Sequence, residues 1–337
     1  MDWFERLTGF REAGYKETQD RLEVHGEHLR SRVNERAYRI GELELVSLAT
    51  LRERVAGSGH TRGRLTVRNV SGDVRTLHRD PAFSGALFQV ASQFNLLEMV
   101  GPSITPEMGV TRYAGDPTQG PACAIAAGAA TIYRNYFAPV GGQIGQTADR
   151  QLDGLADLGD ALARALGRPR ETLWSMRNGY ALPSAEGLAA IDAHLAGCEV
   201  HALDRYRSLL RIGVHSGVEV TDAPLEPRPL VSQAFCSALP VAYAALPARL
   251  WARFATIVLE AAYEATLLAA LLNGERGGSR TVLLTRLGGG AFGNEDGWID
   301  GAMRRALEGL RDRSLDVRVV SYGAPPESMR ALEQAFA

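Results

Sequence analysis

A glycine-rich run near residue 290 is the part of the sequence best suited to bind an anion. Its members are Gly288, Gly289, Gly290, Ala291, Phe292, Gly293 and Asn294. Glycine leaves its backbone N–H open to a ligand, and a helix N-terminus beside such a turn favours phosphate or diphosphate. A tight turn that only packs a strand against a helix explains the glycines equally well, and Phe292 either covers a ribose or base or fills the core. The spacing fits neither GxGxxG nor GxxxxGK[ST], which disfavours the phosphate loop of an ATPase or kinase.

Four acidic side chains in predicted loops can transfer protons or hold a cation: Glu98, Asp116, Glu219 and Asp222. We expect these loops to converge on one site. Structural roles are the alternative: Glu98 can be a solvated charge, and Asp116 can cap a helix. Glu219 and Asp222 can form salt bridges with Arg228. The sequence has no CxxC pair and no HExxH, and no Ser–His or Cys–His arrangement stands out, so neither a metal nor a covalent route is predicted.

Two amide side chains, Asn95 and Gln119, are expected to lie where a ligand can reach them. Asn95 ends an apolar segment, residues 86–94, that predicts a buried strand. Open α/β sheets bind ligands at the carboxyl ends of their strands, and an amide there can donate to and accept from ribose hydroxyls. An Asn that merely turns the chain is an equal alternative. Gln119 lies where a long polar loop, residues 96–120, meets a predicted helix over residues 121–137, and helix capping is its alternative.

The order of elements predicts an α/β fold. Residues 281–287 read as a strand, residues 298–310 as a helix and residues 317–322 as a further strand, and this unit implies a parallel pair. Strands are also expected at 209–214 and 231–241, and a long helix at 250–272. Residues 145–207 read as mostly helical. The first 80 residues are expected to add sheet and helix to the core.

Composition places the chain among ordinary globular proteins. Lys and Arg total 37 and Asp and Glu total 39, so the formal charge is 37 − 39 = −2. This balance argues against non-specific binding of nucleic acid or anionic lipid. The longest apolar stretch is interrupted by Glu260 and Glu264, which argues against a membrane span. Three widely spaced cysteines and a charged N-terminus predict a reducing, cytoplasmic location.

The C-terminal unit resembles the macrodomain fold, in particular its poly(ADP-ribose) glycohydrolase branch. The resemblance rests on residues 288–294, on Trp298 and on the final strand with its ending Ser321-Tyr322-Gly323. Upstream, Phe94-Asn95 looks like the strand end that meets the distal ribose in that family. The glycohydrolases follow this strand with a Gln-Glu-Glu signature. Here Gln119 is followed by Gly120 and Pro121, so cleavage of poly(ADP-ribose) chains is not expected.

Three segments together look most like the MavL-type macrodomains, which are associated with removal of ADP-ribose from arginine, including arginine on ubiquitin. The segments are residues 93–98 (Gln-Phe-Asn-Leu-Leu-Glu), residues 116–121 (Asp-Pro-Thr-Gln-Gly-Pro) and Gly293-Asn294. The resemblance implies a three-layer α/β/α domain over residues 1–337 with a mixed central sheet. Residues 1–80 would extend the sheet, and residues 145–207 would form a helical insertion.

The resemblance also implies roles for the candidate residues. Residues 288–294 would hold the diphosphate of ADP-ribose, Asn95 and Gln119 would hold the distal ribose, and Glu98 would also contact the ligand. The guanidinium and the attacking water would be oriented by three carboxylates, Asp116, Asp222 and Glu219. Carboxylates can bind a guanidinium in bidentate fashion and stabilise an oxocarbenium-like transition state.

The function expected is therefore hydrolysis of mono-ADP-ribose from protein, in particular from arginine, without a cofactor or metal. The partners expected are ADP-ribose and an ADP-ribosylated protein such as ubiquitin, with no membrane. A non-catalytic reader of ADP-ribose is the alternative, although loop carboxylates would repel a diphosphate and have little use in a reader. Hydrolysis of ADP-ribose from nucleic acid is a third alternative, against which the net charge argues.

Overall fold

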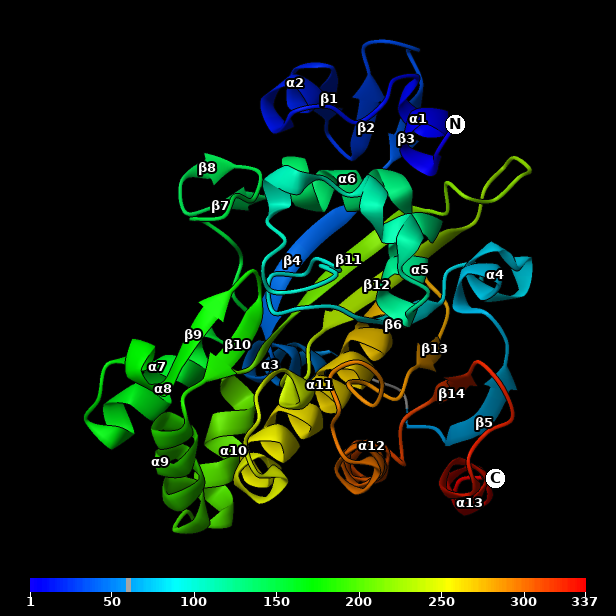
Figure 1. Ribbon diagram of the computed structural model, residues 1–337. Coiled ribbons are helices and arrows are strands. Elements are labelled where there is room, and N and C mark those ends of the chain that lie inside the picture. The colour runs from blue at the N-terminus through cyan, green and yellow to red at the C-terminus, as the bar shows by residue number, and fades with distance from the viewer. Residues whose placement is uncertain (59–61) are drawn as a thin grey trace.

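The computed structural model describes residues 1–58 and 62–337, and its centre is a seven-stranded mixed sheet (Figure 1). In spatial order the strands are β4 (Glu42–Ser47), β11 (Arg211–Glu219), β12 (Leu230–Cys236), β6 (Leu87–Ala91), β13 (Thr281–Leu284), β14 (Leu315–Ser321) and β5 (Leu65–Ser71). β4, β11 and β12 pair antiparallel, whereas β12, β6, β13, β14 and β5 run parallel. The carboxyl ends of these five parallel strands therefore meet at one edge of the sheet, where α/β proteins bind ligands.

Helices cover both faces of this sheet (Figure 1). One face carries α4 (Val74–Arg79), α5 (Gln119–Ala126) and α6 (Gly128–Tyr136), and the other carries α3 (Leu48–Gly57), α11 (Ala248–Glu275), α12 (Asp296–Gly309) and α13 (Glu327–Ala335). The predicted three-layer α/β/α arrangement with a mixed central sheet is confirmed. The parallel pairing of β13 with β14 around α12 is confirmed as well.

The long helix α11 is the centre of the larger core. Sixteen of its residues are buried, among them Trp251, Phe254 and Tyr263. Its length and composition would allow it to cross a membrane, but 78% of its apolar window is buried inside the molecule, as in the core helix of a soluble fold. Two of its acidic residues face arginines: Glu260 pairs with Arg207 and Glu264 with Arg52.

The sequence predicted one helix over residues 121–137, and the structure has two, α5 and α6. The chain leaves helical geometry at Ala127 (φ −110°, ψ 56°), between α5 and α6. Groups from the loop after β11 take the place of intrahelical partners there: the Thr221 hydroxyl accepts a hydrogen bond from Gly128 N at 2.9 Å, and the Ala126 carbonyl accepts one from Asp222 N. Gly128 also packs under the Trp3 ring, where a Cβ would come within 2.8 Å of Cζ3.

The first 40 residues form a separate layer on α6 rather than an extension of the main sheet. They comprise α1 (Trp3–Thr8), α2 (Tyr15–Asp20) and a three-stranded antiparallel sheet, β1 (Leu22–His25), β2 (His28–Ser31) and β3 (Ala37–Arg39). Among the described residues 1–58 and 62–80, β4 and β5 are the strands that join the central sheet, at its two opposite edges. The segment thus adds two strands to the central sheet and two helices, α3 and α4, to the core, as predicted, whereas its first 40 residues do not extend the sheet.

Glu12, between α1 and α2, fastens this layer to the loop that precedes α5. Its Oε1 accepts hydrogen bonds from Val110 N and the Tyr136 hydroxyl, each at 2.8 Å. Its Oε2 accepts one from Thr111 N at 2.8 Å and one from the Thr111 hydroxyl. One carboxylate therefore holds the start of a 3₁₀ helix, Thr111–Gly115, that leads directly to Asp116.

Residues 145–207 form the expected mostly helical insertion. Its helices are α7 (Ala156–Leu166), α8 (Arg170–Leu173), α9 (Ala185–Ala196) and α10 (Val200–Leu209), and a short hairpin, β9 (Trp174–Arg177) and β10 (Tyr180–Pro183), lies among them. A smaller hairpin, β7 (Pro139–Val140) and β8 (Gln143–Ile144), precedes them. The turn between β9 and β10 meets the end of β6, where Gly179 O accepts a hydrogen bond from Phe94 N.

Candidate functional site

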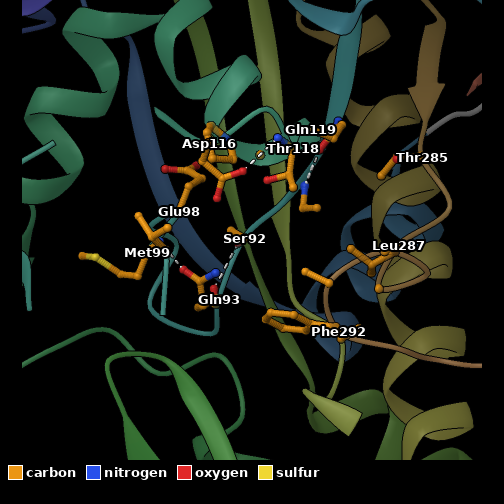
Figure 2. A pocket seen from close by; sticks show the side chains of 18 of the residues that line it. Ser92, Gln93, Glu98, Met99, Asp116, Thr118, Gln119, Thr285, Leu287 and Phe292 are labelled. Atoms are coloured by element: carbon orange, nitrogen blue, oxygen red, sulfur yellow. Dashed lines mark hydrogen bonds between the residues drawn. The ribbon is translucent and has the colours of Figure 1, made fainter. Parts of the chain in front are cut away.

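A cavity of about 360 Å³ opens at the carboxyl edge of the parallel strands. The loop after β6, the start of α5 and the glycine-rich loop after β13 form its walls. Figure 2 shows Asp116 and Glu98 on one side of this space and Leu287 and Phe292 on another. Parallel strands β6 and β13 are neighbours in the sheet, so the loops that follow them necessarily face the same space.

The glycine-rich loop offers unpaired backbone donors to this cavity. Across residues 1–58 and 62–337, the N–H groups of Gly290, Ala291 and Phe292 have no hydrogen-bond acceptor. Packing does not require a glycine at position 290, because a Cβ on Gly290 would meet nothing within 4 Å. Gly288 is different: its φ is +77°, and a Cβ would lie 2.4 Å from the Cβ of Ala238. The loop therefore combines an anchor at Gly288 that only glycine fits with an open segment whose donors can receive an anion.

Asn294 holds this loop in shape instead of lining the cavity. Its buried amide donates to Leu239 O at 2.8 Å, and its backbone N–H donates to Gly288 O at 3.0 Å. Gly289 and Gly293 also lie outside the lining. Of the seven residues predicted to contact a diphosphate, four border the cavity: Gly288, Gly290, Ala291 and Phe292.

Glu98 borders the cavity as a buried carboxyl group. Its Oε1 accepts a hydrogen bond from Arg134 Nη2 at 3.2 Å, and both side chains are 0% exposed. Burial raises the pKa of Glu98 to about 7, although the positive charge of Arg134 opposes this rise. The Arg134 guanidinium stacks on Phe235, with its centre 3.8 Å from the ring centroid. Glu98 is thus not the solvated loop charge that the sequence left open.

Asp116 borders the same cavity in a more exposed setting. Its Oδ1 accepts a hydrogen bond from Thr118 N at 2.8 Å, which is the turn that a residue before a helix makes. The helix α5 begins one residue later, at Gln119. This turn and a role toward a ligand are compatible, because the second carboxylate oxygen of Asp116 remains available, whereas the N-cap residue of α5 is Thr118.

Gln119 and Asn95 use their amides within the protein. Gln119 Oε1 accepts from Ala91 N, and its Nε2 donates to Gln89 O, each at 2.8 Å, so this side chain clamps the start of α5 to β6. Asn95 is 0% exposed and lies outside the cavity lining. Its Nδ2 donates to Gln151 Oε1 at 2.8 Å, and its Oδ1 accepts from Leu97 N. The structure thus places Gln119 at the cavity wall but turns Asn95 toward the helical insertion.

The expected convergence of four acidic residues is wrong for Glu219 and Asp222. Because β11 runs antiparallel to β12, its C-terminal end lies at the opposite edge of the sheet from the cavity. Asp222 N bonds to Ala126 O at the far end of α5 from Asp116, and its carboxylate is held by Arg75 in two bonds of 2.7 Å. Glu219 pairs with Arg228 at 3.0 Å, as its structural interpretation predicted. Neither residue reaches the candidate site.

Sequence reasoning missed two aromatic residues in the cavity wall, Tyr180 and Tyr243. They form a cluster with Phe292, with ring centroids 5.1 to 5.6 Å apart. The three rings come from the hairpin of the insertion, the segment after β12 and the glycine-rich loop. Tyr180 also donates its hydroxyl to Met99 O at 2.7 Å. No local sequence pattern predicts such a cluster, since its members are at least 49 positions apart along the chain.

The fold and the cavity define an α/β protein with an open cavity at the carboxyl edge of its sheet. The sequence matches no protein-family model and no curated protein. Solved structures with some likeness include a poly(ADP-ribose) glycohydrolase from Thermomonospora curvata, at 14% identity over 94% of this chain and 93% of that one, with a TM-score of 0.43. Another is the poly(ADP-ribose) glycohydrolase from Deinococcus radiodurans in complex with ADP-ribose, at 13% identity over 88% and 95%, with a TM-score of 0.46.

Proposed function

We propose that this protein is a macrodomain-like hydrolase that removes mono-ADP-ribose from protein, with arginine as the modified residue. The observation that carries the proposal is one cavity with unpaired backbone donors at Gly290, Ala291 and Phe292 and carboxyl groups at Glu98 and Asp116. Donors of this kind suit a diphosphate. Carboxyl groups suit a guanidinium and a water molecule at ribose C1.

Asp116 is the carboxylate proposed to orient the guanidinium. Asp116 lies just before the N-terminus of α5. One of its carboxylate oxygens accepts the bond from Thr118 N, and the other does not take part in that bond. The cavity of about 360 Å³ leaves room for a ligand of nucleotide size only if part of the ligand remains in solvent. A modified arginine on a substrate protein meets this condition, because the polypeptide that carries the arginine stays in solvent outside the cavity.

The experiment compares release of ADP-ribose from peptides modified on arginine, glutamate or serine, measured by mass spectrometry. We expect release from the arginine conjugate, and a loss of about 10²-fold or more in Asp116→Asn. Calorimetry with free ADP-ribose should give similar affinities for both proteins. Binding of ADP-ribose without release from any conjugate would identify a reader instead, and release from serine or glutamate alone would refute the arginine assignment.

A further inference from the structure

Glu98 has an oxygen that the protein itself leaves without a partner. Within the described ranges, 1–58 and 62–337, no group donates a hydrogen bond to Glu98 Oε2, and this atom is buried. A buried polar atom without a partner costs about 1–3 kcal/mol, and more when the group carries charge. Such groups are retained where a ligand or a reacting water completes them. The residue borders the cavity that Asp116 also lines.

The surrounding chain fixes the position of this carboxyl group at the cavity wall. Gly120 has no side chain beside it, and a Cβ at that position would lie 3.2 Å from Glu98 Cγ and 2.0 Å from Ala91 O. Glu98 therefore occupies the space that a side chain at position 120 would otherwise need. Arg134 fixes the other oxygen, Oε1, and also donates to Leu96 O at 3.1 Å, so the carboxyl group and its loop are held from behind.

From this geometry we infer that Glu98 is the general base of the reaction, an inference that rests on the proposed function. Its free Oε2 accepts a proton from the attacking water while the water oxygen bonds to ribose C1 and the bond from C1 to the guanidine nitrogen breaks. The bonding electrons leave with the guanidine. Glu98 then returns the proton to that nitrogen, so the products are ADP-ribose and protonated arginine. Arg134 is the positioning residue that keeps Oε1 occupied and Oε2 free.

The electrostatic setting suits Glu98 for this role. A general base works best when its pKa lies near the working pH, and burial raises the pKa of Glu98 to about 7. The groups that face it are Arg134 from α6, which lowers its pKa, and Tyr113 and Cys123, whose own pKa values are raised by burial so that both stay neutral. The Tyr113 hydroxyl also accepts a hydrogen bond from Glu98 N.

The test measures release of ADP-ribose from the arginine conjugate as a function of pH. For the unaltered protein, kcat should rise with pH to a plateau, with a midpoint near the Glu98 pKa of about 7. In Glu98→Gln, we expect kcat to fall about 10²-fold to 10⁴-fold and the pH-dependent limb to vanish. Arg134→Met should move the limb to higher pH, because the guanidinium no longer opposes the raised pKa.

Controls separate this role from binding and from folding. Circular dichroism should show that Glu98→Gln folds, and its affinity for free ADP-ribose should stay within a few fold of the unaltered protein. Glu98→Asp should restore part of the pH-dependent limb. An equal loss of affinity and turnover in Glu98→Gln, or turnover that survives the change, overturns the general-base role alone. Absence of release by the unaltered protein overturns the proposed function and this role together.

Discussion

Gly288 and Gly290 lie two residues apart in one loop, but the protein needs glycine at these positions for different reasons. At Gly288 the backbone has φ +77° and a Cβ would collide with Ala238. We expect Gly288→Ala to lower the free energy of unfolding by about 1–3 kcal/mol. Denaturation in urea measures this loss, and an unchanged midpoint would show that position 288 tolerates a side chain.

At Gly290 we expect an effect on ligand binding rather than on stability. A Cβ there meets no protein atom within 4 Å, so Gly290→Ala should change the free energy of unfolding by less than about 0.5 kcal/mol. A methyl group over the free N–H groups should instead weaken binding of ADP-ribose, by about tenfold or 1.4 kcal/mol. Calorimetry compares the two alanine variants, and unaltered affinity in Gly290→Ala would mean that the diphosphate lies elsewhere.

At the scale of elements, the contact between α5 and β6 stabilises one wall of the cavity. Gln119 bridges Ala91 N and Gln89 O. Gln119→Ala leaves both groups without that partner, and we expect a loss of about 1–3 kcal/mol in the free energy of unfolding. Thr118→Ala is the control, because Thr118 makes no side-chain capping bond. Loss of ADP-ribose affinity without loss of stability would instead support the ribose contact first predicted for Gln119.

Elements with a strong local pattern were predictable from the sequence. The apolar run of β13, the glycines after it and the periodic helix α12 were found within a few residues of their bounds. The break at Ala127 was not, since it depends on Thr221 and other groups from a distant loop. The position of Asp222 failed for the same reason: the direction of β11 in the sheet is set by its pairing with β4 and β12, which no local pattern contains.

At the scale of the whole molecule, two buried histidines should make the fold sensitive to acid. Burial lowers the pKa of His78 from 6.5 to about 4 and lowers that of His215 well below its usual range. The unfolded chain therefore binds protons more readily than the folded one at acidic pH. The stability that each neutral histidine contributes is complete above pH 6.5 and is lost as the pH falls toward the folded-state pKa, by on the order of 3 kcal/mol for His78.

Urea denaturation between pH 7.5 and pH 4 checks this prediction at about half-unit steps. His78→Gln should flatten the loss of stability below pH 6.5, whereas His201→Gln, at an exposed position, should leave it unchanged. Glu98 acts in the opposite sense: with its raised pKa, its contribution is complete below pH 4.5 and is lost as the pH rises through about 7. An acid branch that persists unaltered in His78→Gln would assign the sensitivity to other groups.

We predict that Glu12 gives the N-terminal layer an influence on the cavity. Through Val110 and Thr111 it anchors the segment that ends at Asp116. We expect Glu12→Gln to make that segment cleavable by trypsin at Arg112 and to slow turnover, while Glu17→Gln, on the exposed surface nearby, should do neither. Peptide mapping by mass spectrometry provides the measurement, and equal resistance of both variants would refute the coupling.

A minimal fragment trimmed to the central sheet would consequently be a poor catalyst even if it folded. The sheet carries the cavity, but the loop that leads to Asp116 is held by a carboxylate from the first dozen residues. A design that transfers this cavity to another scaffold would also need to include the N-terminal layer that contains Glu12.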